Sequence, residues 1–143
     1  MTDDVKVRVK KVLDDYLEAC QHRKTPERYA ILDAVYSIDK HFTLEELGEY
    51  LSKSGFRVSR ATLYNTIHLL VELKLVVRHG LAQGTKYEAS LGRENHVHQV
   101  CTVCGGVTDI DAPLVTQAIG QTQLHDFRCD EFALYIYLSL IHI

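Results

Sequence analysis

The sequence predicts an α+β fold in two parts: a helical first part that ends in a β-hairpin, and a smaller, strand-rich second part. Apolar residues recur at helical spacing up to about residue 74. After that point, short β-prone runs alternate with turns that contain glycine. Hydrophobic residues make up 46% of the 143 residues, which is typical of a folded globular chain.

Four helices are predicted in the first part. They cover residues 4–20, the stretch that begins at Thr25-Pro26-Glu27, the stretch that begins at Thr43-Leu44-Glu45-Glu46, and the stretch from Ser59 to about Lys74. The hydroxyls of Thr25, Thr43 and Ser59 are expected to cap the helices that follow them. Gly55 is expected to end the third helix in a left-handed conformation. The interior face of that helix is expected to include Tyr50.

A hairpin follows the fourth helix, with β-prone runs at 75–79 and 85–88 around Gly80 and Gly84. Helices followed by a two-stranded wing predict a winged helix-turn-helix that binds DNA through its last helix. The outward face of that helix carries Arg60, Ala61, Tyr64, Asn65 and His68. Arginine and asparagine can read base edges in the major groove.

Residues 89–95 are polar and include a glycine, so we predict a winged-helix DNA-binding domain at 1–88, a hinge at 89–95, and a dimerisation and metal-binding domain at 96–143. The second domain is predicted to hold strands at 99–101 and 107–110, a helix from Pro113 to about Gln123, and a last strand at 132–140. That strand is apolar on both faces, and an apolar sheet edge favours pairing with a second copy. We therefore expect a homodimer.

Metal-ligand residue types cluster after the hinge. His96 and His98 lie one residue apart, so on a strand their side chains point the same way and can share one ion. Cys101 and Cys104 form a Cys-x-x-Cys-Gly turn that suits a second site. Neither pair alone supplies the four ligands of a closed site.

Charge is uneven along the chain, whose net charge is -3. Residues 1–90 hold 14 Lys or Arg and 13 Asp or Glu, whereas residues 91–143 hold 2 and 6. Only the first part can therefore present a local basic patch to a polyanion such as DNA. Four cysteines, the absence of a secretory pattern at Met1-Thr2-Asp3-Asp4, and the lack of an apolar run of ~18 residues predict a cytoplasmic protein without a membrane span.

Three stretches resemble the ferric uptake regulator family of bacterial metal-dependent repressors. They are Thr25-Pro26-Glu27-Arg28-Tyr29-Ala30-Ile31-Leu32, Ser59-Arg60-Ala61-Thr62-Leu63-Tyr64-Asn65, and His96-Val97-His98-Gln99-Val100-Cys101-Thr102-Val103-Cys104-Gly105. The resemblance implies a homodimeric repressor of metal-uptake or related genes that binds operator DNA. The DNA contacts expected on this basis are Arg23, Lys24, Arg57, Ser59, Arg60, Thr62, Tyr64 and Asn65.

The resemblance also implies a regulatory metal site built across the hinge. Its expected ligands are His41, Glu88, His96, His98 and Asp109, and the expected ion is Fe(II), Mn(II) or Zn(II). Glu88 is offset by about one residue from the family's hinge carboxylate, so Ser90 or Glu94 are alternatives at that place.

The sequence departs from the family pattern at three places. The second cysteine pair of the family's structural zinc site would fall at Leu140 and Ile143, so Cys101 and Cys104 form an incomplete site. Cys129 or His142 could substitute, or the pair could be unmetallated or redox-active. A further ion site of many relatives is replaced by Val97, Thr116 and Phe132, which we interpret as packing residues. The family's minor-groove lysine is replaced by Glu18-Ala19, which would move contacts to Arg23 and Lys24.

Other functions remain open at this point. Asn65 and Asp109 resemble the peroxide-sensing branch of the family, in which metal-catalysed oxidation of a site histidine would release DNA. Exposed cysteine and histidine side chains could bind haem. An enzyme is not expected, because no nucleophile, Gly-rich phosphate loop or acid–base pair accompanies the metal ligands.

Overall fold

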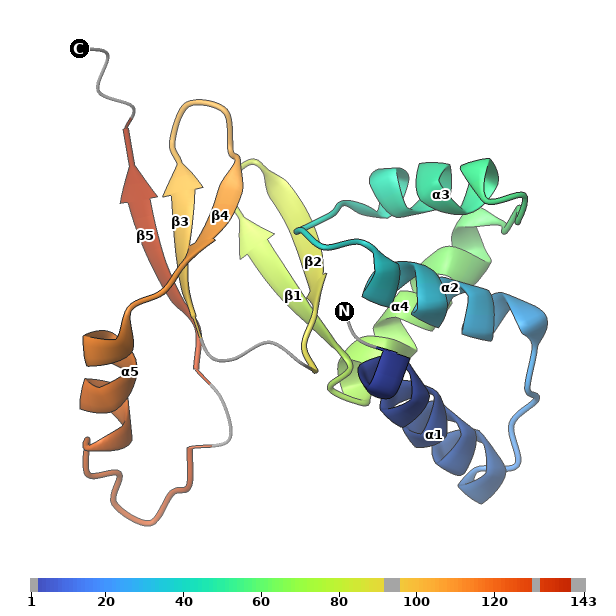
Figure 1. Ribbon diagram of the computed structural model, residues 1–143, viewed down its shortest axis with the longest axis horizontal. Coiled ribbons are helices and arrows are strands. Elements are labelled where there is room, and N and C mark those ends of the chain that lie inside the picture. Colours follow the sequence, from blue (N-terminus) through green and yellow to red (C-terminus); the bar gives the residue numbers. More distant parts are fainter. Residues whose placement is uncertain (1–2, 92–95, 130–131, 140–143) are drawn as a thin grey trace. The chain divides into compact units, whose positions relative to one another are not determined.

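The computed structural model describes residues 3–91, 96–129 and 132–139, and its elements are labelled in Figure 1. The chain divides into two units, residues 1–92 and residues 93–143, which we describe separately. The predicted α+β class is confirmed. Part of the predicted hinge, residues 92–95, lies outside the described residues. No helix in the described part of the chain is both long and apolar enough to cross a membrane.

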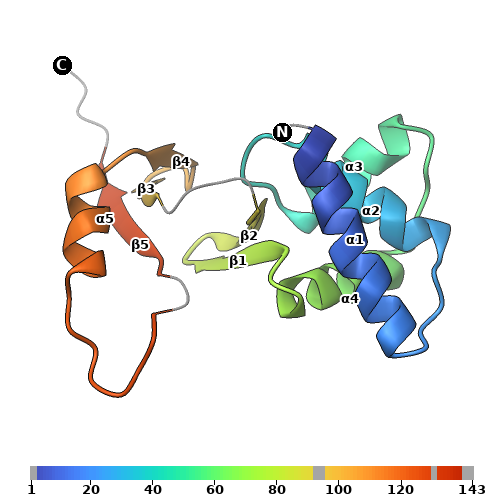
Figure 2. The ribbon, with the colours of Figure 1, turned by 60° about the horizontal axis from the view of Figure 1, so that its bottom comes forward.

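The first unit contains four helices and a hairpin (Figures 1 and 2). The helices are α1 (Asp3–Ala19), α2 (Pro26–Ser37), α3 (Leu44–Lys53) and α4 (Arg60–Glu72). Strands β1 (Val76–Leu81) and β2 (Gly84–Ala89) pair in antiparallel fashion. The α4 helix therefore ends two residues before the predicted Lys74, and the hairpin forms as predicted.

Two of the three predicted helix caps are present. The Thr43 hydroxyl accepts the amide N–H of Glu46 at 3.1 Å, and the Ser59 hydroxyl accepts that of Thr62 at 3.1 Å. The prediction for Thr25 was wrong, because its side chain makes no capping hydrogen bond. Its backbone carbonyl instead accepts the N–H of Arg28. At the end of α3, Gly55 has φ +82°, as predicted for a left-handed stop.

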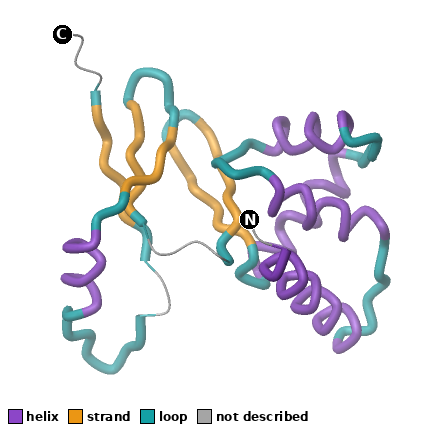
Figure 3. Tube along the Cα trace, viewed as in Figure 1, coloured by secondary structure: helices purple, strands orange, loops and turns teal. Residues whose placement is uncertain are grey.

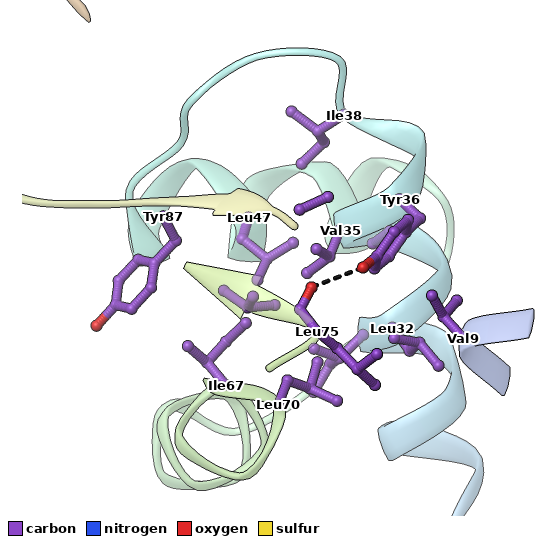
Figure 4. Packing of buried hydrophobic residues seen from close by; sticks show 14 of the residues in the cluster. Val9, Leu32, Val35, Tyr36, Ile38, Leu47, Ile67, Leu70, Leu75 and Tyr87 are labelled. Atoms are coloured by element: carbon purple, nitrogen blue, oxygen red, sulfur yellow. Dashed lines mark hydrogen bonds between the residues drawn. The ribbon is translucent and has the colours of Figure 1, made fainter. Parts of the chain in front are cut away.

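A hydrophobic core holds the first unit together, and every member of its buried cluster lies between residues 5 and 89. The Tyr36 hydroxyl, buried in this core, donates to the carbonyl of Leu75 at 2.7 Å (Figure 4). Leu47 and Leu51 of α3 are buried, whereas Tyr50 is 39% exposed. The expectation that Tyr50 lies inside was wrong. Adjacent residues are about 100° apart around a helix, so Tyr50 sits beside the stripe that Leu51 completes.

The second unit is a three-stranded sheet with one short helix (Figure 3). Its elements are β3 (Val97–Cys101), β4 (Val107–Ile110), α5 (Pro113–Gly120) and β5 (Leu134–Leu138). The strand order is β4-β3-β5, with β3 antiparallel to β4 and parallel to β5. The apolar last strand is thus at a sheet edge, as predicted. It is shorter than 132–140, and α5 stops before the predicted Gln123.

Much apolar surface of the second unit is exposed. Helix α5 has no buried residue. Val103 is 73% exposed, Leu114 79% and Phe127 82%. On β5, Tyr137 is 56% exposed. These exposed apolar side chains come from the β3–β4 turn, from α5, from the segment after α5 and from β5.

Candidate metal centre and DNA-binding face

A buried cluster of two histidines and one glutamate lies in the first unit. His79 Nε2 is 2.8 Å from Glu88 Oε1, and His41 Nε2 is 3.5 Å from Glu88 Oε2. The rings of His41 and His79 are 5.1 Å apart between centroids. His79 is fully buried, and Glu88 and His41 are 2% and 7% exposed. The glutamate thus presents one carboxylate oxygen to each imidazole.

Backbone pairing brings these three residues together. In the β1–β2 hairpin, His79 lies opposite Lys86, so Glu88 is its diagonal neighbour two residues further along the partner strand. His41 comes from the loop before α3. Its neighbour Phe42 forms an isolated antiparallel bridge with Tyr87, with N–H···O distances of 2.9 and 2.8 Å. That bridge holds the His41 loop beside the second strand of the wing.

A second cluster, of two histidines and one aspartate, lies in the second unit. His98 on β3 is directly opposite Asp109 on β4. Asp109 Oδ1 is 3.2 Å from His98 Nδ1 and 3.2 Å from His96 Nε2. The two imidazole rings are 4.5 Å apart, so they face the same side of the strand, as their spacing predicted. Tyr135 on β5 stacks on the His98 ring at 5.2 Å and limits its rotation.

Both clusters fit a transition-metal ion. Within each set of three residues, one ligand atom per residue lies within 4.8 Å of the others. Two imidazoles with one carboxylate suit Fe(II), Mn(II) and Zn(II). The structure therefore brings His41 together with Glu88 in one cluster, and His96 and His98 together with Asp109 in the other. The alternative Ser90 uses its hydroxyl to donate to the carbonyl of Lys74, and Glu94 lies outside the described residues.

Sequence reasoning missed His79, which was considered only as part of a β-prone run. A signal was available. The hairpin has two residues, Ala82 and Gln83, between its strands, and a two-residue loop fixes the register of the strands that flank it. That register makes residues 79 and 88 diagonal neighbours, and histidine and glutamate are both residue types that bind metal ions.

The cysteine pair forms a tight turn between β3 and β4. The N–H of Gly105 donates to the carbonyl of Cys101, and Gly105 has φ +73°. Backbone N–H groups of Cys104 and then Val103 hold the pKa of the Cys101 thiol below its ordinary value. Cys104 and Cys129 are exposed, and Cys101 is half-buried. Positions 140, 142 and 143, where further ligands were considered, lie outside the described residues.

Three residues that we interpreted as packing residues stand where many relatives have a further ion site, and they differ in burial. Val97 is fully buried, as a packing residue should be. Thr116 and Phe132 are half-buried. All three lack a side chain that binds transition metals well.

The exposed face of α4 carries the predicted DNA-reading side chains. Arg60, Tyr64 and Asn65 are all exposed. One groove beside α4 is lined by Arg28, Arg57 and Asn65 among others, and a second, between α4 and the wing, by Arg60, Tyr64 and Arg78 among others. Both flanks of the helix therefore carry guanidinium groups that suit phosphate.

Three other residues that are expected to contact DNA already interact with neighbouring side chains. The Ser59 hydroxyl caps α4 and donates to the Thr62 hydroxyl at 2.8 Å. The Lys24 ammonium forms ion pairs with Glu18 and Asp14. These carboxylates would compete with a phosphate for Lys24. Arg23, next to Lys24, is exposed.

The first unit is helical with a two-stranded wing, and the second unit is a small sheet. Each unit also holds a histidine–carboxylate cluster. Together these features define a class of winged-helix proteins equipped to bind metal. Residues 19–137 match the ferric uptake regulator family. That match covers most of the chain, and the chain belongs to this family.

Relatives and solved structures are consistent with that assignment. A ferric uptake regulation protein of Campylobacter upsaliensis is 33% identical over 94 residues, which are 64% of this chain and 60% of that protein. A peroxide-responsive repressor PerR of Staphylococcus aureus is 29% identical over 121 residues, 80% of this chain and 78% of that protein. The Helicobacter pylori ferric uptake regulator has the same fold, with a TM-score of 0.77 at 15% identity over 93% of this chain and 91% of that chain. The match to the Campylobacter protein thus spans about three fifths of its length.

Proposed function

We propose that this chain is a metal-responsive, DNA-binding transcriptional repressor that acts as a homodimer in the cytoplasm. The observation that carries the proposal is the presence, in one chain, of a helix that exposes Arg60, Tyr64 and Asn65 and of a histidine–carboxylate cluster in each unit. The family assignment supports a regulator rather than an enzyme. The genes controlled would be those for metal uptake or related functions.

The regulatory metal would be held by residues from both units. His41 and Glu88 would contribute from the first unit, and His96, His98 and Asp109 from the second. When bound, Fe(II), Mn(II) or Zn(II) would supply a cross-link between segments on either side of residues 92–95. If DNA binding favours the cross-linked arrangement, metal raises DNA affinity, and DNA must raise metal affinity by the same factor.

The first unit would read DNA through α4. Arg60, Tyr64 and Asn65 would approach base edges, and Arg23 and Arg57 would contact phosphates. In a dimer, two such helices would enter successive major grooves about one helical turn apart. Phosphate contacts would make the affinity fall as salt rises.

The dimer interface would form from the second unit. Strand β5 is an apolar sheet edge, and side chains such as Leu114 and Phe127 are largely exposed. A second copy could cover this surface and pair with the open edge. Sedimentation equilibrium tests the oligomeric state, and a monomer at micromolar concentration would contradict it.

The metal switch is tested by DNA binding with and without metal. Duplexes would first be selected from a random pool by Mn(II)-loaded protein, and their binding then measured by fluorescence anisotropy with Fe(II), Mn(II), Zn(II) or chelator. At least about a tenfold gain in affinity with one of these metals is expected, within the usual range of allosteric coupling. The double variant H96A/H98A should lose that gain. An affinity unchanged by every metal and by chelator would refute the switch.

Peroxide sensing is a second candidate function. The similarity to the Staphylococcus repressor, together with Asn65 and the aspartate Asp109 in the second cluster, supports it. Iron-loaded protein would be treated with peroxide and its tryptic peptides weighed by mass spectrometry. The peptide that contains His41 or the peptide that contains His96 is expected to gain the mass of one oxygen atom. If neither peptide gains mass, peroxide sensing by this mechanism is refuted.

A further inference from the structure

We propose that His79, together with His41 and Glu88, forms a divalent-cation site contained wholly in the first unit. The regulatory site described above does not include His79. The new site shares two residues with that site but needs no ligand from the second unit. The DNA-binding unit would thus hold an ion even when the histidines of the second unit are absent.

The spacing of the ligand atoms supports the site. Atoms that bind one ion at about 2.0–2.2 Å, at angles between 90° and the tetrahedral value, lie roughly 3–3.5 Å from one another. His79 Nε2 and Glu88 Oε1 are 2.8 Å apart, and His41 Nε2 and Glu88 Oε2 are 3.5 Å apart. These distances correspond to the edges of a coordination polyhedron. One ligand atom from each of the three residues lies within 4.8 Å of the others.

The site is also held in place before any ion binds. His79 and Glu88 lie on paired strands of a hairpin, and backbone hydrogen bonds between Phe42 and Tyr87 hold the His41 loop beside them. All three side chains are buried. Little conformational entropy would therefore be lost on binding, which favours affinity.

The donor set selects the class of ion. Two imidazoles and one carboxylate suit Fe(II), Mn(II), Co(II) and Zn(II) rather than Ca(II) or Mg(II), which prefer oxygen ligands. A purely structural role for His79 is the competing explanation, in which its ring only donates a hydrogen bond to Glu88. The two explanations differ in whether a metal ion contacts the His79 nitrogen.

The first experiment titrates Co(II) into full-length H96A/H98A, which lacks the histidines of the second cluster. One Co(II) should bind with visible ligand-field bands. Co(II) at Cys101 and Cys104 would be recognised separately by a near-ultraviolet thiolate charge-transfer band. Adding His79→Gln should lower the affinity about tenfold or more, although glutamine can still donate an N–H to Glu88. The control His22→Ala removes an exposed histidine of the same unit and should leave the affinity unchanged.

The second experiment observes His79 directly. Wild-type protein labelled with ¹⁵N-histidine is titrated with Zn(II), and the His79 signals are assigned by comparison with His79→Gln. A large shift of the His79 Nε2 resonance, with that of His41, is expected. Two outcomes would overturn the proposal. In the first, the His79 resonances stay unshifted while those of His41 move. In the second, the H96A/H98A protein binds Co(II) with equal affinity with and without His79→Gln.

These outcomes are separate from those of the proposed function. If metal leaves DNA affinity unchanged but shifts the His79 resonance, the site exists and the regulatory proposal fails. If metal controls DNA binding while His79 is unaffected, the regulatory proposal stands and the His79 site is refuted. Circular dichroism of each variant without metal shows whether it is folded, and the wild-type titration needs no variant to report ligation.

Discussion

His98 and Asp109 face each other directly across the β3–β4 ladder, with Nδ1 and Oδ1 3.2 Å apart. The same carboxylate oxygen is 3.2 Å from His96 Nε2. One aspartate thus contacts two imidazoles, and the pairing of β3 with β4 brings the aspartate to them. Asp109 is consequently the residue whose loss should disturb the second cluster most directly.

Asp109→Asn should weaken metal binding by about tenfold or more, because it removes the charged ligand of the proposed site while keeping the side-chain shape. Zn(II) affinity measured by competition with a chromophoric chelator provides the test. Asp111→Asn is the matched control, since Asp111 is exposed just beyond β4. Equal losses in the two variants would indicate a general charge effect rather than ligation by Asp109.

Tyr36→Phe should destabilise the first unit by about 1–3 kcal/mol, because a buried carbonyl loses its hydrogen-bond donor. The Tyr36 hydroxyl donates to the carbonyl of Leu75 at 2.7 Å and accepts the N–H of Leu91 at 3.2 Å. Urea unfolding followed by far-ultraviolet circular dichroism measures the change. Tyr64→Phe, at a residue that is 57% exposed, should change the unfolding free energy little.

Ser59→Ala should cost about 1 kcal/mol of unfolding free energy, because the N-terminus of α4 loses its side-chain cap. Thr25→Ala should cost less than about 0.5 kcal/mol, since Thr25 makes no such bond. The two helices begin with similar sequence signals, so the pair tests whether the observed cap geometry decides stability. The same urea unfolding measurement applies, and equal costs would contradict the difference between the caps.

Asn65→Ala and Arg57→Ala should weaken DNA binding in different ways. Loss of Asn65 should cost about 1–3 kcal/mol on the selected duplex and little on unrelated DNA, as expected for a base contact. Loss of Arg57 should weaken binding to all duplexes and reduce the slope of log affinity against log salt by about one. Arg128→Ala, in the second unit, serves as the charge control. The roles would be wrong if both variants changed the salt slope equally.

Alkylation of Cys101 by iodoacetamide should reach half its maximal rate at a lower pH than alkylation of a cysteine in a short unstructured peptide. Backbone N–H groups of Cys104 and Val103 stabilise the thiolate and lower the pKa of Cys101. A lowered pKa means more of the reactive thiolate at any pH below the ordinary value. Mass spectrometry of the Cys101 peptide across a pH series gives the rates. A half-maximum at or above that of the peptide would contradict the stabilisation.

Features that depend on short spacings were predictable. The i, i+2 spacing of His96 and His98 determined their shared side of β3, and the glycine after Cys104 marked the turn. Apolar residues at helical spacing predicted α1 to α4, and β-prone runs around glycines predicted the wing. In each case the controlling interactions join residues close in the chain, so sequence periodicity carries the information.

Other features depended on contacts between distant residues. The role of Tyr50 was misjudged because the width of the buried stripe on α3 is decided by what packs against it. The cap at Thr25 was misjudged because identical residue types can satisfy an N-terminus through the side chain or the backbone. The spacing of residues along the chain shows neither how wide the buried stripe of a helix is nor which group caps its N-terminus.

The sequence by itself determined the two-part α+β architecture, the exposed polar face of α4 and the paired histidines of the second unit, because these follow from local periodicity. Only the tertiary structure decided that His41 joins His79 and Glu88. His41 reaches the wing through a backbone bridge between Phe42 and Tyr87, which are far apart in sequence. Such a contact forms only when the whole first unit folds, because its position depends on the packing of the helices that connect its two sides.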